Sequence, residues 1–498
     1  MTFFAGARFH FIGIGGISMS ALAKILLSKG YKVSGSDLTQ NAQTKELHAM
    51  GCPICIGHNA ENVLGADFVI INGAIGAENK ELAAARANNI PIIMRDKLLA
   101  EISNDYDKII AVAGCHGKST TTAMIGAIMT AGGFNPTIHN GALMRSHEVA
   151  SVGDSQMRSN EIASGIPYGA VPFATLTNGV TEWSQMRSHE IESNLRLGGS
   201  TFFITEACEF KRSFLSLSPT LAVITNIDAD HLDCYTDIND IKNAFAEFCD
   251  KTDIVVKNAE DANSNDIKGR KKTITFGINM GDVHTKNLRM GFDNKYSFEV
   301  ILDEKKFGKL YNNFVIKLGV HGLHNVYNAL GAIAAGLSFG ADVRAITNAI
   351  QNYSGVARRF EHIVNIGNTP VILDYAHHPN EIKTTIKTAD TLYQKYLLVF
   401  QPHTFTRTLA FFADFVSVLS KIKNLAIYKT YSAREKPIAG GRANDLYKVI
   451  KSSNPTAKYF ANTTPLKKYI ELTANKYDAI ILCGAGDVVS GEFLTNEK

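Results

Sequence analysis

The chain has 498 residues, of which 45% are hydrophobic and 20% are charged. This length exceeds what a single hydrophobic core supports, so we expect roughly two to four globular domains. With 51 basic and 47 acidic residues, the formal net charge of +4 argues against a nucleic-acid-binding or membrane-surface protein. The sequence has neither an apolar run as long as a membrane span nor a signal-peptide pattern, so we expect no membrane insertion and a cytoplasmic location.

Cysteine usage agrees with a reducing compartment, because the seven cysteines are widely spread and most lie in hydrophobic runs. Cys52 and Cys55 have C-x-x-C spacing, but no second Cys or His pair follows them. We therefore interpret them as part of a buried strand edge and not as a zinc or redox site.

Residues 1–107 are predicted to form a Rossmann-like α/β domain that begins with a glycine turn. Its expected elements are a strand at 9–12, a helix over 21–28, strands at 32–34 and 68–71, a helix over 80–88 and a strand at 91–94. The turn contains Gly13, Gly15 and Gly16, and Asp37 stands where such folds place an acid near a ribose. G-x-G-G is an incomplete dinucleotide fingerprint, so the turn indicates either a nucleotide site or close helix–strand packing without a ligand.

A second α/β domain, residues 108–355, begins with a hydrophobic strand that leads into a phosphate-binding type of loop. The loop and the start of the next helix contain Gly114, Cys115, His116, Gly117, Lys118, Ser119 and Thr120. Such a loop points backbone N–H groups and a helix N-terminus at an anion, and Lys118 adds a positive charge. A hydroxyl of Ser119 or Thr120 suits Mg²⁺. The G-x-x-G-K-S spacing is shorter than the usual P-loop, yet it predicts ATP binding on a mostly parallel sheet.

Two later strands of this domain are expected at 202–205 and 221–225, and polar residues follow both. Glu206 ends the first, and His231 follows the second. Since strand ends of an open parallel sheet face the ligand crevice, we expect Glu206 and His231 to converge on a metal ion beside the phosphates. Carboxylate is a common neighbour of Mg²⁺, although imidazole is an unusual one. A hydrophobic helix over 329–337 is expected to close the domain.

One part of the central domain, about residues 144–193, is repeated sequence. The octapeptide at 144–151 recurs in altered form at 157–164 and 186–193, with uneven spacing. Uneven spacing excludes a solenoid. We interpret the segment as a repeat-derived insertion that forms a dispensable surface loop or hairpin.

Residues 356–498 are predicted to form a third, Rossmann-like α/β domain. Its expected strands are at 371–373, 396–400, 424–428 and 479–482, with helices between them. This strand–helix alternation indicates parallel sheets in all three domains.

Polar clusters near the third domain are each ambiguous alone. His324 and Asn325 either cap a helix or contact an adenine, and Arg358 with Arg359 either grips a phosphate or forms surface ion pairs. Further clusters follow two predicted strands, and they contain Asp374, Tyr375 and His377 in one case and His403 and Arg407 in the other. Their joint placement at strand ends favours a site.

The order of these motifs resembles the Mur ligase family. The similar segments are Gly13–Ser20, Gly114–Thr122, Thr225–Asp233, His324–Asn325, Arg358–Phe360, Asp374–Pro379, Gln401–Thr408 and Gly484–Asp487. Together they span nearly the whole chain apart from the repeats. The G-x-G-G-x-x-M-S, D-Y-A-H-H-P and Q-P-H-x-F-T-R-T runs are most similar to those of the member that adds L-alanine.

The resemblance implies a three-domain enzyme of peptidoglycan synthesis with small-molecule substrates, acting as a monomer or homodimer. ATP would phosphorylate the lactyl carboxylate of UDP-N-acetylmuramate, and the alanine amine would attack the acyl phosphate. By resemblance, the glycine turn with Ser18 and Asp37 binds the UDP-sugar, which removes a role in NAD binding. The implied catalytic residues are Lys118, Glu206, His231, Arg358, Asp374 and His377. ATP is implied to contact residues 114–120, His324, Asn325 and Arg359, Mg²⁺ to contact Ser119, Glu206 and His231, and the amino acid to contact Tyr375, His403 and Arg407.

Two departures from the family pattern leave other functions open. The family commonly has E-A-D-E-S where this chain has Cys208 as the third residue, and Ile71–Ile75 replaces a more usual Ser-Ser-Ala-Ile. The alternatives are a related ligase that attaches a preformed peptide to the same nucleotide sugar, and a catalytically weak nucleotide-sugar-binding protein.

Overall fold

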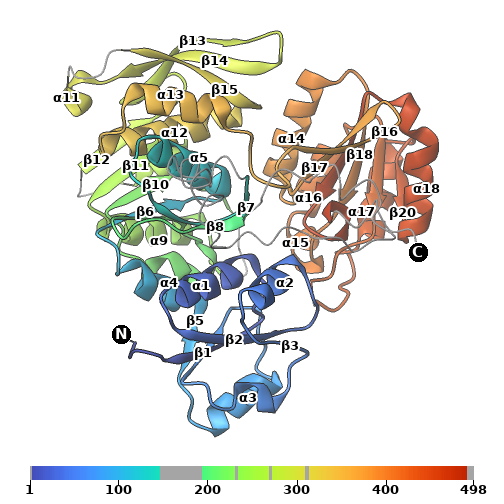
Figure 1. Ribbon diagram of the computed structural model, residues 1–498. Coiled ribbons are helices and arrows are strands. Elements are labelled where there is room, and N and C mark those ends of the chain that lie inside the picture. Colours follow the sequence, from blue (N-terminus) through green and yellow to red (C-terminus); the bar gives the residue numbers. More distant parts are fainter. Residues whose placement is uncertain are drawn as a thin grey trace, which may run out of the picture.

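Three α/β domains build the molecule, which we describe from a computed structural model. The structure describes residues 3–145, 193–229, 234–267, 272–308, 313–433 and 435–490. The N-terminal domain (blue in Figure 1) lies below the central domain, and the C-terminal domain (orange to red) lies beside both. Among the helices so described, none is both long and apolar enough to cross a membrane. The predicted insertion at 144–193 falls almost wholly outside the described residues.

The N-terminal sheet is entirely parallel, with strand order β3-β2-β1-β4-β5. Its strands are β1 (Arg8–Ile12), β2 (Lys32–Asp37), β3 (Ile54–Ile56), β4 (Phe68–Ile71) and β5 (Ile92–Met94). The helices are α1 (Ile17–Ser28), α2 (Ala42–Ala49), α3 (Lys80–Ala87) and α4 (Arg95–Ser103). The expectation of a buried Cys52–Cys55 edge is only half right, because Cys52 is buried whereas Cys55 is exposed on the edge strand β3.

The central sheet has the order β15-β14-β13-β12-β11-β10-β6-β9-β7-β8 in the described residues. Its strands are β6 (Lys108–Ala113), β7 (Thr137–Met144), β8 (Ser193–Arg196), β9 (Phe202–Glu206), β10 (Leu221–Ile224), β11 (Ile254–Asn258), β12 (Lys272–Phe276), β13 (Val283–Met290), β14 (Lys295–Leu302) and β15 (Phe314–His321). The helices are α5 (Lys118–Ala131), α9 (Ile238–Asp250), α10 (Ala262–Asp266), α11 (Glu304–Phe307), α12 (His324–Ser338) and α13 (Val343–Asn352). Strand β6, which carries the glycine loop, lies between β9 and β10, so residues after these two strands flank the loop.

The central sheet is mostly parallel, as predicted for this domain, but it is not parallel throughout. β13, β14 and β15 form an antiparallel extension, and β8 pairs antiparallel with β7. The residues of β14 alternate between buried and half-buried, as in an antiparallel strand with one covered face, whereas β6 is buried along nearly all its length. The predicted closing helix is α12, and α13 follows it before the third domain.

The C-terminal sheet has the order β16-β17-β21-β18-β19-β20 and is parallel except for β16. Its strands are β16 (Glu361–Ile366), β17 (Thr369–Asp374), β18 (Tyr396–Gln401), β19 (Leu425–Tyr428), β20 (Lys458–Phe460) and β21 (Ala479–Gly484). The helices are α14 (Pro379–Leu392), α15 (Phe405–Ala410), α16 (Phe412–Leu419), α17 (Ala443–Ser453) and α18 (Thr463–Thr473).

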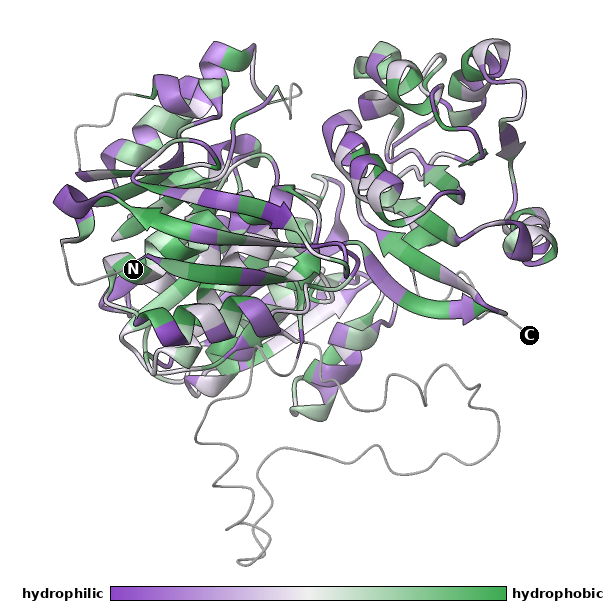
Figure 2. Cartoon of the chain, turned by 90° about the horizontal axis from the view of Figure 1, so that it is seen from above, coloured by the Kyte–Doolittle hydropathy of each residue, from purple (hydrophilic) through white to green (hydrophobic). Residues whose placement is uncertain are grey.

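Apolar strands form the centre of the molecule, and amphipathic helices cover them. Figure 2 shows the strands largely in green, with helices whose purple residues face outward. The described N-terminal and central domains share one hydrophobic cluster, in which Phe11 of β1 and Phe203 of β9 are both fully buried. This shared core fixes the first glycine turn relative to the second domain.

Candidate active site

The glycine loop after β6 has the backbone geometry of a phosphate-binding loop. Gly114 and Gly117 have φ of 134° and 83°, which side-chain-bearing residues rarely adopt. A Cβ atom at Gly114 would collide with the Thr225 hydroxyl, and one at Gly117 would collide with Asn328. Gly117 also precedes the first residue of α5, so the loop ends at a helix N-terminus. The loop therefore offers backbone N–H groups and a positive helix end to an anion.

Lys118 is held in this loop by carbonyl oxygens and by a carboxylate. Its Nζ donates to the carbonyl oxygens of Gly114 and Cys115 and lies 3.1 Å from Oε1 of Glu209. Burial opposes the charge on Lys118, but the carboxylate of Glu209 outweighs it and raises the pKa of the ammonium above its ordinary value. Glu209 therefore keeps the Lys118 side chain protonated in the loop.

The sequence predicts a metal-binding role for Glu206, whereas the carboxylate that contacts Lys118 is that of Glu209, which was not among the predicted site residues. Glu206 accepts a hydrogen bond from the backbone N–H of Gly141, at 2.7 Å. Glu209 itself is only 1% exposed. Cys208, between them, is a neutral thiol because burial raises its pKa. His231 lies outside the described residues.

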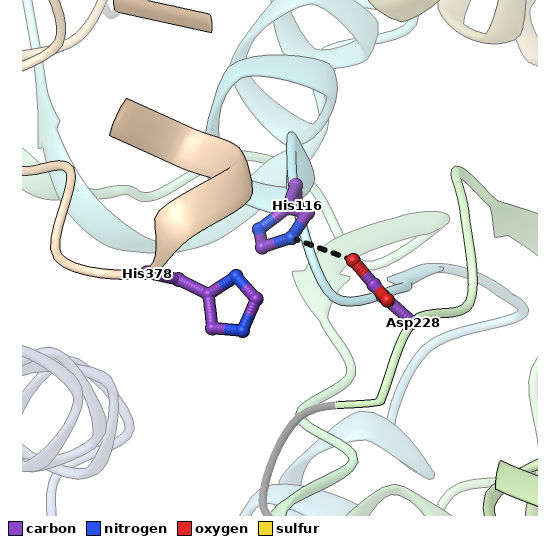
Figure 3. A group of neighbouring side chains, drawn as sticks. All are labelled: His116, Asp228 and His378. Atoms are coloured by element: carbon purple, nitrogen blue, oxygen red, sulfur yellow. Dashed lines mark ion pairs between the residues drawn. The ribbon is translucent and has the colours of Figure 1, made fainter. Parts of the chain in front are cut away.

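His116 of the loop connects the central and C-terminal domains. Its Nε2 lies 3.8 Å from a carboxylate oxygen of Asp228, and its ring centre lies 5.4 Å from that of His378 (Figure 3). One ligating atom from each of these residues lies within 4.8 Å of the others. Burial disfavours the imidazolium, but Asp228 and Glu381 raise the pKa of His116 to about 9. In the absence of a metal ion, the contacts of His116 with Asp228 and Glu381 form an ion-pair cluster.

A cavity of about 610 Å³ opens beside the loop, between the central and C-terminal domains. Its wall includes Ser119, Thr120, His324, Asn325 and Arg359. Asn325 donates to the carbonyl oxygen of His321 and accepts from Asn328, at 2.7 and 2.9 Å. The structure thus brings the start of α12 against the glycine loop.

His324 begins α12, as the sequence predicts for a helix start at this position. Burial, together with the charge of Arg359, lowers its pKa to about 4. The side chain is therefore a neutral imidazole at the cavity wall.

Arg358 and Arg359 lie in the linker between the two domains. Both guanidinium groups lie over the ring of Tyr375, at 5.5 and 5.7 Å from its centre. The backbone N–H of Arg358 donates to Glu361 at 2.7 Å, and φ is 60° at Arg358 and 48° at Phe360. Only Arg359 of the pair lines the cavity.

The C-terminal domain places its predicted residues after β17 and β18. Asp374 ends β17 and accepts from the hydroxyl of Thr385 at 2.8 Å, and burial raises its pKa to about 6. The rings of His377 and His403 lie 5.4 Å apart, which brings the two sequence clusters together. Arg407, in α15, lies near enough to both imidazoles to lower their pKa values further.

The first glycine turn is stabilised from two sides. The backbone N–H of Gly15 donates to Asp37 at 2.9 Å, and a Cβ atom at Gly15 would lie 2.6 Å from Asn41. Gly13 has a φ of 79°, and Gly16 is the N-cap of α1. Ser18 contacts His139 of β7 at 3.0 Å, so this turn also faces the central domain.

Three α/β domains around a lysine-bearing phosphate-binding loop define an enzyme that uses a nucleoside triphosphate. Models of the Mur ligase family match all three parts: the catalytic domain at residues 8–107, the middle domain at 112–336 and the glutamate ligase domain at 358–486. The chain therefore belongs to the Mur ligase family.

Named relatives support the same assignment over nearly the full length. The UDP-N-acetylmuramate–L-alanine ligase of Clostridium tetani is 37% identical over 489 residues, which are 97% of this chain and 96% of that protein. The ligase of the same name from Agathobacter rectalis is 36% identical over 494 residues, 96% of this chain and 95% of that one. The crystal structure of a UDP-N-acetylmuramate–alanine ligase from Thermotoga maritima superposes with a TM-score of 0.75 at 28% identity, covering 98% of both chains.

Proposed function

We propose that this enzyme joins L-alanine to the lactyl carboxylate of UDP-N-acetylmuramate at the expense of ATP, in peptidoglycan synthesis. Family membership supports an ATP-dependent ligase, and the two relatives at 36–37% identity carry the specific activity in their names. The structural observation that carries the proposal is the cavity between the loop bearing Lys118 and the C-terminal domain. Such a cavity lets ATP and the amino acid meet at one point.

The proposed reaction has two steps, phosphorylation of the carboxylate and attack by the amine. A carboxylate oxygen of the sugar nucleotide attacks the γ-phosphorus, the bond to the β-phosphate oxygen breaks, and ADP leaves. The amine of L-alanine, after losing a proton, attacks the acyl carbon, and the tetrahedral intermediate expels phosphate. One carboxylate oxygen therefore ends in inorganic phosphate. Lys118 and Arg359 would neutralise charge on the transferred group.

The residues beside the loop fit a magnesium ion. Ser119 lines the cavity and Glu209 contacts Lys118, and a hydroxyl and a carboxylate are the hard oxygen donors that Mg²⁺ prefers. We propose Ser119, Glu206 and His231 as its ligands, as the sequence predicts, with Glu209 as a further candidate carboxylate. Bound Mg²⁺ would supply charge neutralisation between the β- and γ-phosphates.

The remaining site residues divide between two substrates. We propose that Gly13, Gly15, Gly16, Ser18 and Asp37 form the UDP-sugar site. After β17 and β18, the cluster of Tyr375, His377, His403 and Arg407 would bind the amino acid, with Arg407 binding its carboxylate. Asp374 would orient this group through its fixed contact with Thr385. We place the enzyme in the cytoplasm, where ATP is present.

ADP release tests the proposal. Purified protein is given Mg-ATP and UDP-N-acetylmuramate, with L-alanine, glycine, L-serine or a tripeptide added in turn. We expect release that requires the sugar nucleotide and is fastest with L-alanine. Release that requires the tripeptide would establish the peptide-adding ligase instead. Tight binding of the sugar nucleotide without release under any acceptor would indicate a binding protein.

A further inference from the structure

Glu381 lies in the first turn of α14 and has no role in the reaction as described so far. Its side chain is 12% exposed. One carboxylate oxygen, Oε2, accepts hydrogen bonds from the backbone N–H groups of His377 and His378, at 3.0 and 3.3 Å. These bonds form part of a capping box at the start of α14. This half of the carboxylate stabilises the loop that carries His377.

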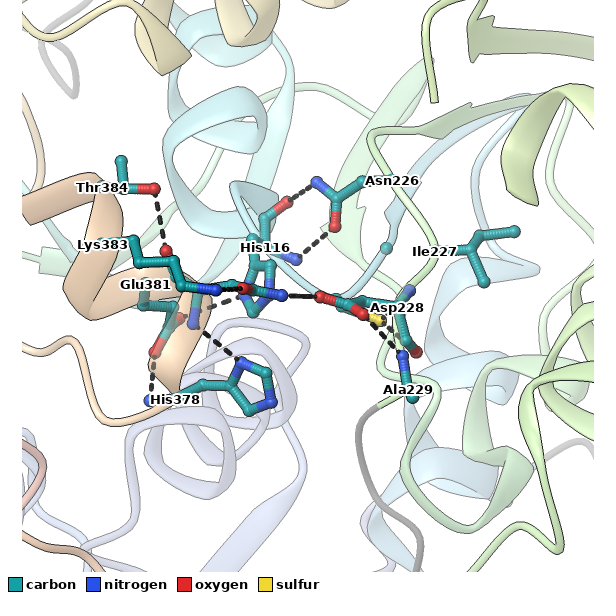
Figure 4. A network of polar contacts seen from close by, with 12 residues as sticks. His116, Asn226, Ile227, Asp228, Ala229, His378, Glu381, Lys383 and Thr384 are labelled. Carbon is teal, nitrogen blue, oxygen red and sulfur yellow. Dashed lines mark hydrogen bonds and ion pairs between the residues drawn. The ribbon is translucent and has the colours of Figure 1, made fainter. Parts of the chain in front are cut away.

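The other oxygen of Glu381 points out of the C-terminal domain. Oε1 lies 3.4 Å from Nδ1 of His116 in the glycine loop and 3.5 Å from a guanidinium nitrogen of Arg359 in the linker. Figure 4 shows the contacts running from α14 through Glu381 to His116 and on to Asp228. Asn380, the residue before Glu381, donates a hydrogen bond to the carboxylate of Asp228, so α14 also contacts Asp228 directly. One carboxylate thus joins three parts of the site.

Electrostatics in this buried position favour the ionised form of Glu381. Burial opposes ionisation, but the neighbouring groups of His377, His116 and Arg359 outweigh it and hold the pKa of Glu381 well below its ordinary value. Removal of the negative charge would leave the positive charges of His116 and Arg359 buried with less compensation. The C-terminal domain would then lose much of its attraction to the loop.

We propose that Glu381 is a positioning residue that couples docking of the C-terminal domain onto the glycine loop to the placement of His116 and Arg359 at the ATP site. The inference rests on the proposed ligase function. Glu381 acts through residues that would contact ATP, and it need not touch a substrate itself. Glu381 holds His116 and Arg359 at the phosphate-binding site only when the C-terminal domain is docked.

Glu381→Gln tests the coupling, because glutamine keeps the size and an oxygen for the backbone N–H groups but lacks the charge. We expect kcat to fall by about 10- to 100-fold and KM for ATP to rise, while KM for UDP-N-acetylmuramate stays unchanged. Because they share one network, Glu381→Gln and His116→Asn should be less than additive. The matched control is Glu247→Gln, an exposed carboxylate paired with Lys251 on α9, which should keep wild-type kinetics.

Small-angle scattering gives a second readout that does not depend on turnover. ATP with the sugar nucleotide should compact the wild type and Glu247→Gln but not Glu381→Gln. If Glu381→Gln does not fold, His116→Gln breaks the same contact from the other domain and should also prevent compaction. Normal kinetics and compaction in Glu381→Gln, or full additivity with His116→Asn, would overturn the inference. Absence of ADP release by the wild type would instead overturn the proposed function, and the scattering comparison would still decide the coupling.

Discussion

The glycine loop and the facing edge of the C-terminal domain bury ionisable groups in opposite states. At the loop, Lys118 lies 3.1 Å from Glu209, and the contacts of His116 with Asp228 and Glu381 raise its pKa to about 9. At the edge of the C-terminal domain that follows β17 and β18, burial lowers the pKa of His377 to about 4 and that of His403 to about 3. The loop therefore holds charged groups, and this edge holds neutral imidazoles.

The difference arises from the balance of charges around each group. His116 faces two carboxylates, whereas His403 faces the imidazole of His377 and the guanidinium group of Arg407. The two states suit two tasks. Transfer of a phosphoryl group needs fixed charges, and an attacking amine needs surroundings that leave its lone pair free.

Removal of the loop charge should have the largest effect on this arrangement. Lys118→Met is expected to lower kcat by about 10³-fold or more, because a preorganised charge at the transferring phosphoryl group is lost. The rate of ADP release at saturating substrate concentrations measures this kcat. The control is Lys108→Met, an exposed lysine at the start of β6. A loss of less than tenfold in Lys118→Met would show that Lys118 is not the phosphate-binding cation.

Glu209→Gln and Glu206→Gln separate the two candidate carboxylates. We expect Glu209→Gln to lower kcat by about 10²-fold, since Glu209 contacts Lys118. Glu206→Gln should cost about tenfold or less. If Glu206→Gln raised the Mg²⁺ concentration for half-maximal rate more than Glu209→Gln did, Glu206 and not Glu209 would be the metal ligand.

The charge on His116 predicts a pH-dependent contribution to stability. Because its pKa in the folded protein is raised to about 9 from an ordinary 6.5, the stabilisation is fully present below pH 6.5 and is lost as pH rises through 9. We expect His116→Gln to be less stable than wild type at pH 6, by on the order of 2 kcal/mol. Urea unfolding from pH 6 to 10 should show this gap closing. A gap that widens with pH would mean that His116 is neutral in the folded protein.

Cys208→Ser should have the smallest effect. Burial raises the pKa of the thiol, so the substitution exchanges one neutral group for another. We expect kcat within about threefold of wild type and a change in unfolding free energy of about 1 kcal/mol or less. Loss of activity on this substitution would mean that the Cys208 thiol itself takes part in the reaction.

The sequence was sufficient for features that depend on local pattern. The β6–loop–α5 unit, the start of α12 at His324 and four strands of the C-terminal sheet (β17, β18, β19 and β21) follow from apolar runs, glycines and helix starts. The edge strands β16 and β20 were not predicted. The shared N-terminal and central core was not predictable, and neither was the antiparallel extension β13–β15. Both depend on partners distant in the chain.

Glu209 and Glu381 show why part of the site escaped prediction. After Glu209 the chain turns through left-handed conformations at Lys211 and Arg212, with φ of 51° and 55°. Neither residue type signals such a turn. Glu381 has the sequence position of an ordinary helix-start carboxylate, and its second set of contacts arises only from domain docking.

Transfer of an isotopic label tests the central claim most directly. UDP-N-acetylmuramate carrying ¹⁸O in its lactyl carboxylate is incubated with Mg-ATP, L-alanine and enzyme, and the products are analysed by mass spectrometry. An acyl phosphate predicts one ¹⁸O atom in each phosphate released, with one alanine joined per ADP formed. Phosphate without label, or ADP formation without amide product, would contradict the proposed ligation.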